Sequence, residues 1–240
     1  MSFYHSVCYS YDISACHYNI MKNSGYDVSM LPEDDKKKRN ILIGIMIGKD
    51  PSFGKFLRNT TKSVMDYYIQ LNKLKKSEIL LRQYDGMFVT RKLELMHNPD
   101  FPVRLEEREF YDTFLLSNCR RMYMGLNSTR GNFFVKGIPN GDEYTHMIKF
   151  YHRLLNINFM SKTGLSGSLK YLKEEFLTSD NLDLFKIPIG GKFRIYIIDY
   201  GKIDVSKRSA NMIQIDEIDK EYYFHIYLEP FFKAIVHDLF

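Results

Sequence analysis

The chain has 240 residues, of which 45% are hydrophobic and 26% charged, a balance typical of a folded globular protein rather than a disordered one. Its formal net charge of +5 favours an anionic partner without requiring one. The scattered cysteines Cys8, Cys16 and Cys119 exclude a disulfide framework and a Cys-x-x-Cys zinc site, so a reducing, cytoplasmic compartment is expected. No stretch of about 18 apolar residues occurs, and no membrane span is therefore expected.

The first third of the chain predicts one strand followed by three helices. Alternating apolar residues predict the strand, which ends at Asp12, and the short helix after it stops at Ser24-Gly25. Asp34 and Asp35 supply the N-cap and first turn of a second helix, and Pro51 suits the start of a third. The predicted ranges are strand Phe3–Asp12, helix Ile13–Asn23, a helix from Lys36 onward, and helix Pro51–Leu71.

A β-hairpin is predicted within Ile79–Thr90. Two apolar runs flank Asp85-Gly86, and Asp-Gly supplies the positive φ that a two-residue hairpin turn needs. Such a hairpin carries the Asp85 carboxylate at its tip, which suits a metal site. Asp-Gly is also a common hairpin turn, so by itself it requires no function.

The rest of the chain predicts further strands and then mainly helices. Turn residues at 98–102, 127–131 and 139–141 separate the strands, Gly190-Gly191 is the expected turn of a late strand pair, and Pro230 lies in an early turn or at a kink of the last helix. The fold class is therefore α+β, and the best domain boundary lies within Ile138–Asp142. The predicted ranges are strands Arg104–Leu116, Arg121–Leu126 and Asn132–Ile138, helices Glu143–Leu155 and Leu165–Leu177, strand pair Lys186–Asp199, and helix Ile218–Phe240.

Two carboxylates and one helix face carry the chemistry. Asp12 closes a strand and Asp85 tips a hairpin, so one sheet can bring them together to hold two divalent cations about 4 Å apart for in-line phosphoryl or nucleotidyl transfer. On the second helix, Lys36 and Asn40 share a face with Gly44, and a basic group there can contact a triphosphate. Without that context, a Lys/Arg run at a helix start is simply a solvated face.

The order of these pieces resembles the C-terminal polymerase half of a family B DNA polymerase. Motif A of that family is an Asp that ends a strand, motif B is Lys-x-x-x-Asn followed by Gly, and motif C is an Asp-Thr-Asp hairpin. The matching segments are Asp12–Ile20, Lys36–Gly44 and Gln83–Val89, with Asp85 on the second Asp of motif C.

Two further elements of the family have counterparts downstream. Arg121–Tyr123 and Lys136-Gly137 resemble its Lys-x-Tyr element and the Lys-Gly that follows, and Ile218–Pro230 is similar to its thumb segment. No single motif is specific, but five in the right order are hard to obtain by chance. The resemblance implies a palm made of an antiparallel sheet with packed helices, reduced fingers and a mainly helical thumb. The implied domains are palm 1–33, fingers 34–75, palm 76–140 and thumb 141–240.

The resemblance also implies an activity, template-directed addition of nucleotides to a primer 3′ end by a DNA polymerase. The implied cofactor is Mg²⁺ or Mn²⁺, and the implied partners are primer–template DNA and deoxynucleoside triphosphates. The implied residues are catalytic Asp12 and Asp85, a metal site of Asp12, Asp85 and the Ile13 carbonyl, nucleotide-binding Lys36, Asn40, His17 and Tyr18, and DNA-binding Arg121, Tyr123 and Lys136.

Three departures from the family pattern bear on this interpretation. His17 stands where the family places the Tyr that rejects ribonucleotides, and Gln83 replaces the first Asp of motif C. The segment between Asp12 and Lys36 is too short for the usual pair of fingers helices, which leaves one upstream basic phosphate contact without a counterpart. Proofreading exonuclease and amino-terminal domains are expected on a second chain, as in a split polymerase in the cytoplasm of a phage- or virus-infected cell, or not at all.

Two other functions are considered. The first is a polymerase-derived accessory protein that binds nucleic acid without catalysis, and Gln83 together with the short fingers motivates it. The second is an adenylating ligase or capping-type nucleotidyltransferase. That class needs a Lys-x-Asp-Gly nucleophile motif, which the chain lacks.

Overall fold

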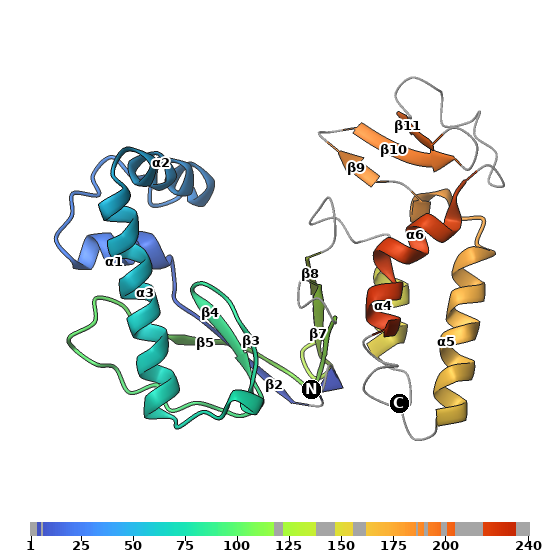
Figure 1. Cartoon of the computed structure of the whole chain (residues 1–240), viewed down its shortest axis with the longest axis horizontal. Coiled ribbons are helices and arrows are strands. Elements are labelled where there is room, and N and C mark those ends of the chain that lie inside the picture. The colour runs from blue at the N-terminus through green and yellow to red at the C-terminus, as the bar shows by residue number, and fades with distance from the viewer. Residues whose placement is uncertain are drawn as a thin grey trace. The chain divides into compact units, whose positions relative to one another are not determined.

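The computed structural model describes residues 4–5, 7–117, 122–137, 147–155, 162–185, 187–189, 192–197, 201–204 and 218–233. The chain divides into two compact units, Val7–Phe110 and a second one formed by Met1–Ser6 with Tyr111–Phe240. Both contain helices and antiparallel strand pairs (Figure 1), which confirms the α+β class. The Val7–Phe110 unit ends at residue 110 of the chain. The predicted boundary, Ile138–Asp142, lies outside the described residues. The palm, fingers and thumb ranges stay predictions.

In the sheet of the Val7–Phe110 unit, the first strand of the unit lies between two strands that come later in the chain. Its order is β3-β4-β2-β5, and β4 pairs antiparallel with both β2 and β3. The β2–β4 register runs from Tyr9 opposite Val89 to Asp12 opposite Gly86. The four strands are β2 Cys8–Asp12, β3 Ile79–Arg82, β4 Gly86–Val89 and β5 Glu106–Tyr111.

Three helices complete this unit, α1 Cys16–Asn23, α2 Lys36–Lys49 and α3 Pro51–Leu71. The predicted starts of α2 and α3 are confirmed, because Asp35 and Asp50 cap them through side-chain bonds to main-chain N–H groups. Helix α1 begins three residues later than expected. Ala15 adopts a left-handed conformation, with φ 42° and ψ 46°, and a helix cannot pass through such a residue.

The core of this unit lies between the helices and the sheet. In Figure 1, the long helix α3 runs alongside the strands, and its apolar side contributes Leu57, Val64, Met65 and Tyr68. Packing of a helix stripe on an apolar sheet face is the usual way for both to leave water. Other fully buried members of this core are Tyr11, Ile13, Ile20, Met21, Met87 and Val89.

The hairpin differs from its prediction in the position of its turn. The N–H of Gln83 donates to the carbonyl of Gly86 at 2.9 Å, so Tyr84 and Asp85 form the loop and Gly86 already belongs to β4. Gly86 does not have the positive φ that was expected of it. The prediction of a turn at Asp85-Gly86 is therefore wrong, although Asp85 does lie at the tip of the hairpin.

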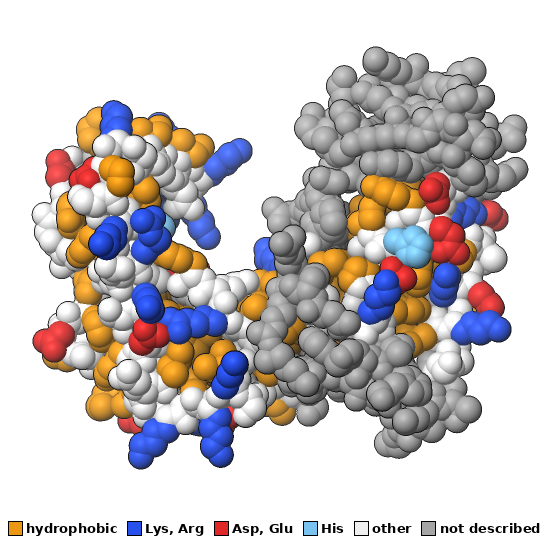
Figure 2. Space-filling model, in the orientation of Figure 1, with side chains coloured by type: hydrophobic (Ala, Val, Ile, Leu, Met, Phe, Trp, Pro, Cys, Tyr) orange, Lys and Arg blue, Asp and Glu red, His pale blue; other side chains and the backbone are white. Residues whose placement is uncertain are grey.

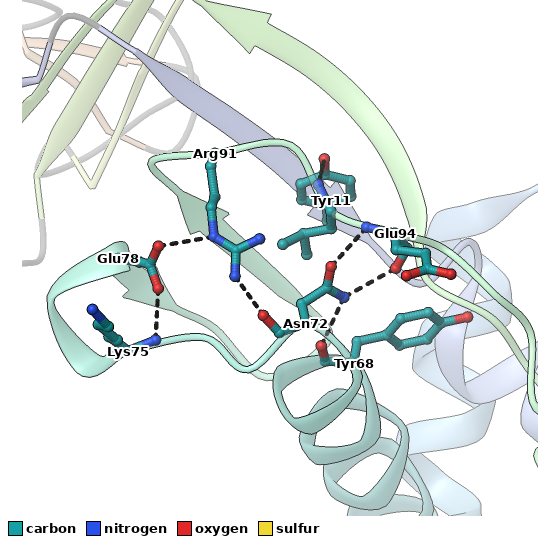
Figure 3. Close-up of polar contacts among 8 residues, drawn as sticks. Tyr11, Tyr68, Asn72, Lys75, Glu78, Arg91 and Glu94 are labelled. Atoms are coloured by element: carbon teal, nitrogen blue, oxygen red, sulfur yellow. Dashed lines mark hydrogen bonds and ion pairs between the residues drawn. The ribbon is translucent and has the colours of Figure 1, made fainter.

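A polar network fastens the end of α3 to the chain that leaves β4 (Figure 3). The Asn72 side-chain amide donates to the carbonyls of Tyr68 and Glu94, and its oxygen accepts from the Glu94 N–H at 2.7 Å. Arg91 donates to the Asn72 carbonyl and to Glu78 at 2.8 Å. Glu78 also accepts from the Lys75 N–H and ends the short 3₁₀ helix η1 Lys76–Glu78. The network fixes the approach to β3 and so the place of the hairpin.

In its described residues, the second unit has two antiparallel sheets and three further α-helices. One sheet has the order β1-β6-β7-β8 and the other β11-β10-β9. Its buried core is rich in aromatic residues, among them Tyr151, Phe176, Phe185 and Tyr223. The strands are β1 Tyr4–His5, β6 Thr113–Leu116, β7 Tyr123–Asn127, β8 Asn132–Lys136, β9 Ile187–Ile189, β10 Lys192–Ile197 and β11 Gly201–Asp204. The helices are α4 Ile148–Leu155, α5 Lys162–Leu177, η3 Leu182–Phe185 and α6 Lys220–Tyr227.

Most predicted elements of this unit are found with adjusted ends. The strand expected over Phe3–Asp12 is split between β1 and β2, and that over Arg104–Leu116 between β5 and β6. The predicted late strand pair is confirmed as β9 and β10, while its turn, Gly190-Gly191, lies outside the described residues. Among the described residues, no helix is both long and apolar enough to cross a membrane.

Candidate nucleotidyl-transfer site

The two predicted carboxylates lie next to one another in the sheet, Asp12 at the end of β2 and Asp85 in the loop just before the adjacent strand β4. Asp12 ends β2 and faces Gly86 across the β2–β4 ladder, one residue from Asp85. The N–H of Ile13 donates to the carbonyl of Asp85 at 2.8 Å, which ties the β2–α1 junction to the tip of the hairpin. Main-chain pairing thus holds the two aspartates side by side.

Gly86 lets these strands approach closely. A Cβ atom built there would lie 2.8 Å from the carbonyl oxygen of Tyr11 and 3.4 Å from Oδ1 of Asp12. The first distance is shorter than real Cβ contacts, and the obstructing atom is main chain, which cannot move without disturbing the ladder. Glycine is therefore required for the close approach of β2 and not for the turn.

A cavity of about 380 Å³ opens in front of the aspartates. Its walls come from three places: the β2–α1 junction, the hairpin tip and one face of α2. The α2 residues recur every three or four positions, as one helix face requires. The lining residues that matter below are Asp12, His17, Tyr18, Lys36, Arg39, Asn40 and Asp85. The structure therefore brings together all the predicted catalytic and nucleotide-binding residues.

The surroundings of Asp12 disfavour the charged form of its carboxyl group. Burial and the nearby charge of Asp85 raise the pKa of Asp12, while Arg108 and Lys36 oppose that rise. Arg108 lies in β5 with its Nη2 3.7 Å from Asp12 Oδ2, and it also contacts Glu106 at 3.3 Å. Since the raising effects prevail, the carboxylate pair has room for additional positive charge.

The residues present suit divalent cations, with a reduced ligand set. Asp12 and Asp85 are oxygen ligands of the kind that Mg²⁺ and Mn²⁺ take, and a bound cation would oppose the burial and the Asp85 charge that raise the Asp12 pKa. Within the described residues, however, no group of three or more His, Cys, Asp or Glu side chains could hold a metal. The expected carbonyl contact of Ile13 stays a prediction.

His17 lies at the cavity wall in contact with the hairpin loop. Its Nε2 is 3.1 Å from the Tyr84 hydroxyl, and the two rings meet edge to face with centroids 5.2 Å apart. Burial is the main cause that lowers the pKa of His17, so its imidazole is neutral near neutral pH. A neutral imidazole held by Tyr84 presents a smaller side chain than the expected Tyr at this position.

The hydroxyl group of Tyr18 points toward the loop before α2. That hydroxyl donates to Glu33 at 2.6 Å, a bond that raises the pKa of Tyr18. The Glu33 carboxylate also accepts from Lys22 at 3.1 Å. The Arg39 guanidinium lies over the ring of Tyr18, 5.0 Å from its centroid.

The predicted DNA-binding residues belong to the other compact unit. Tyr123 in β7 is buried and pairs with Lys136 in β8, whose side chain is exposed. Arg121 lies outside the described residues. The role of these residues in holding a duplex stays a prediction. That a second chain carries exonuclease and amino-terminal domains also stays a prediction.

Sequence reasoning missed Arg39, Arg108 and Tyr84 as residues of this site. Arg39 could have been found, because it lies three residues after Lys36 on the same helix face. Arg108 could not, since nothing in the sequence indicates that β5 lies beside β2. Tyr84 was missed because the turn was predicted at Asp85-Gly86, whereas Tyr84 belongs to the loop.

Comparisons with known proteins support a polymerase-like fold. The chain is similar to the family B DNA polymerase from the hyperthermophilic archaeon Pyrobaculum calidifontis, with a TM-score of 0.52 and 10% sequence identity. The match covers 98% of this chain and 45% of that polymerase, so the chain spans less than half of its length. No protein-family model and no curated protein matches the chain. At this identity the likeness concerns the fold alone.

Proposed function

We propose that this protein is a DNA polymerase-type nucleotidyltransferase, which extends a primer 3′ end along a template. The observation that carries the proposal is one cavity that is lined both by Asp12 and Asp85 and by the basic first turn of α2, with Lys36. The polymerase-like fold supports it.

The aspartates and the α2 residues that line the cavity would have different roles in that reaction. Asp12 and Asp85 would hold divalent cations, whose chemistry is to activate a hydroxyl nucleophile and to neutralise charge on the leaving pyrophosphate. Lys36 and Asn40 would bind and orient the triphosphate and the base-bearing part of the nucleotide. His17 would border the sugar, where its neutral side chain affects the choice between deoxy- and ribonucleotides.

Exposed cations on α3 suit a nucleic-acid partner. Lys55, Arg58 and Lys62 are all exposed and lie three and four residues apart, on one side of the helix. No acidic residue occurs between Pro51 and Met65. On the face of the Val7–Phe110 unit seen in Figure 2, basic side chains predominate over acidic ones. Such contacts would hold phosphates without reading sequence, as would Arg121, Tyr123 and Lys136.

Primer extension tests the proposal. Purified protein is given a labelled primer–template, Mg²⁺ or Mn²⁺, and deoxy- or ribonucleotides in separate reactions. We expect metal-dependent extension that Asp12→Asn and Asp85→Asn both abolish. Asp34→Asn is the matched control, because Asp34 is exposed just before α2 but does not line the cavity. Extension that persists in Asp85→Asn would refute the assignment of the carboxylates.

A second function, nucleic-acid binding without catalysis, is favoured by the small ligand set. Gln83 stands in the hairpin where the family has a carboxylate, and only two carboxylates among the described residues line the cavity. This function predicts salt-dependent binding to primer–template DNA, no incorporation, and no change of the melting temperature with Mg²⁺ or Mn²⁺. Incorporation of even one nucleotide by the wild type, absent in Asp12→Asn, would exclude it.

A further inference from the structure

The cavity side of α2 carries a basic residue to which the polymerase resemblance assigns no role. Lys36, Arg39 and Asn40 line the cavity from the start of the helix. Lys36 and Asn40 match motif B, whereas Arg39 falls on one of its unspecified positions. The positive end of the helix dipole lies at the same turn.

Arg39 is buried although its guanidinium is always charged. Only 8% of the residue is exposed, in contrast with its neighbours Lys37 and Lys38, which are exposed. Nη1 donates to the main-chain carbonyls of Pro32 at 3.3 Å and Glu33 at 2.6 Å. The group thereby also clamps the loop before α2.

These contacts leave Arg39 without a direct ion pair, although its charge is near enough to the Glu33 carboxylate to help lower the pKa of Glu33. Within the described part of the chain, Arg39 forms no ion pair with a carboxylate; the Glu33 carboxylate instead accepts from Tyr18 and Lys22. Burying an unpaired cation costs free energy. Stacking on the Tyr18 ring offsets only part of that cost.

One donor of this guanidinium also lacks an acceptor. Nε of Arg39 is buried, and no described residue accepts a hydrogen bond from it. Buried donors without acceptors are rare in folded proteins and are commonly explained by an absent ligand, ion or water. Arg39 lines the cavity, so an oxyanion there can neutralise its charge, and a small shift of the guanidinium would also give this donor an acceptor.

We propose that Arg39 is a phosphate-binding residue that, with Lys36, holds the oligophosphate group of a nucleotide at the α2 side of the cavity. The inference rests on the proposed nucleotidyl-transfer function and adds the second cation that the sequence left unassigned. It also predicts that oligophosphate binds without a metal, since neither residue depends on one. The outer phosphates would then be held from α2, with the α-phosphate facing Asp12 and Asp85, where the bond to the primer forms and pyrophosphate leaves.

Calorimetry with sodium tripolyphosphate in the presence of EDTA tests this binding directly on the full chain. We expect Arg39→Gln to weaken binding by about tenfold or more, as the loss of a charge-assisted hydrogen bond implies. Lys37→Gln is the matched control: it removes one positive charge from the same helical turn but outside the cavity, and its affinity is expected to stay within about twofold. Equal weakening in both variants, an unchanged Arg39→Gln, or no binding by the wild type would each overturn the inference.

A second measurement avoids the risk that Arg39→Gln unfolds, given the clamp on the loop. The Nε–H resonance of Arg39 in the ¹⁵N-labelled wild type is followed by NMR as tripolyphosphate is added. We expect this signal to shift and its hydrogen exchange to slow; a signal that stays unmoved at saturation contradicts the proposal. Because neither readout requires turnover, a protein that binds tripolyphosphate through Arg39 but extends no primer would refute the polymerase function alone.

Discussion

Replacement of Gly86 by alanine should weaken the junction that carries both aspartates. The added Cβ would lie 2.8 Å from the Tyr11 carbonyl oxygen, about 0.6 Å inside the 3.4 Å at which ordinary contact begins. To make that room, β2 and β4 must separate where the Ile13 N–H meets the Asp85 carbonyl at 2.8 Å. An opening of the same size would bring this bond to about 3.4 Å, beyond the usual range.

The expected cost combines strain with one weakened hydrogen bond. Overpacking of a tight site costs about 1–3 kcal/mol, and a main-chain hydrogen bond contributes about 1 kcal/mol net. We therefore expect Gly86→Ala to lower the free energy of unfolding by about 2–4 kcal/mol in guanidinium denaturation followed by circular dichroism.

A second glycine provides the matched control. Gly48 lies in α2, has open space around its Cβ position and does not line the cavity. Gly48→Ala should leave stability unchanged or raise it by up to about 0.5 kcal/mol, because alanine loses less backbone entropy in a helix. If Gly86→Ala is as harmless as Gly48→Ala, the argument for a close strand approach fails.

Three further predictions concern stability. Burial and the charge of Asp85 raise the folded pKa of Asp12, so the contribution of Asp12 to stability is fully present below the ordinary carboxyl pKa and is lost as the pH rises. Metal-free Asp12→Asn should therefore melt higher than wild type at about pH 7 and equal it near about pH 3; the opposite trend would refute the raised pKa. Ala15→Gly should raise the free energy of unfolding by about 0.5–1 kcal/mol in urea, since glycine tolerates φ 42°; a loss would show that the Ala15 methyl group matters more. Asn72→Ala should cost about 1–3 kcal/mol, and exposed Asn59→Ala under about 0.5 kcal/mol; equal effects would contradict the network.

Local signals in the sequence were sufficient to predict where two of the three α-helices of the Val7–Phe110 unit begin. Asp34 and Asp35 indicated the start of α2, and Pro51 that of α3, because helix starts depend on residues within one turn. The start of α1 was missed, since alanine seldom adopts the left-handed conformation of Ala15 and nothing nearby announces it.

The residues of the site were predictable only where a local sequence pattern marked them. Asp12, Asp85, Lys36 and Asn40 were found because each belongs to a recognisable local pattern. The place of Arg108 was not, as it depends on which strand lies beside β2. The role of Gly86 was misread for the same reason: the residue that excludes a Cβ lies on another strand, and no local pattern reveals it.

The rate of single-nucleotide incorporation by Asp85→Asn, relative to wild type and to Asp34→Asn, tests the central claim most directly. With a saturating primer–template and Mg²⁺ or Mn²⁺, we predict that Asp85→Asn loses about a thousandfold or more, because loss of a metal ligand removes several kcal/mol of transition-state stabilisation. Asp34→Asn should keep the wild-type rate. A wild-type rate in Asp85→Asn, or no incorporation by the wild type with either metal, would contradict the account.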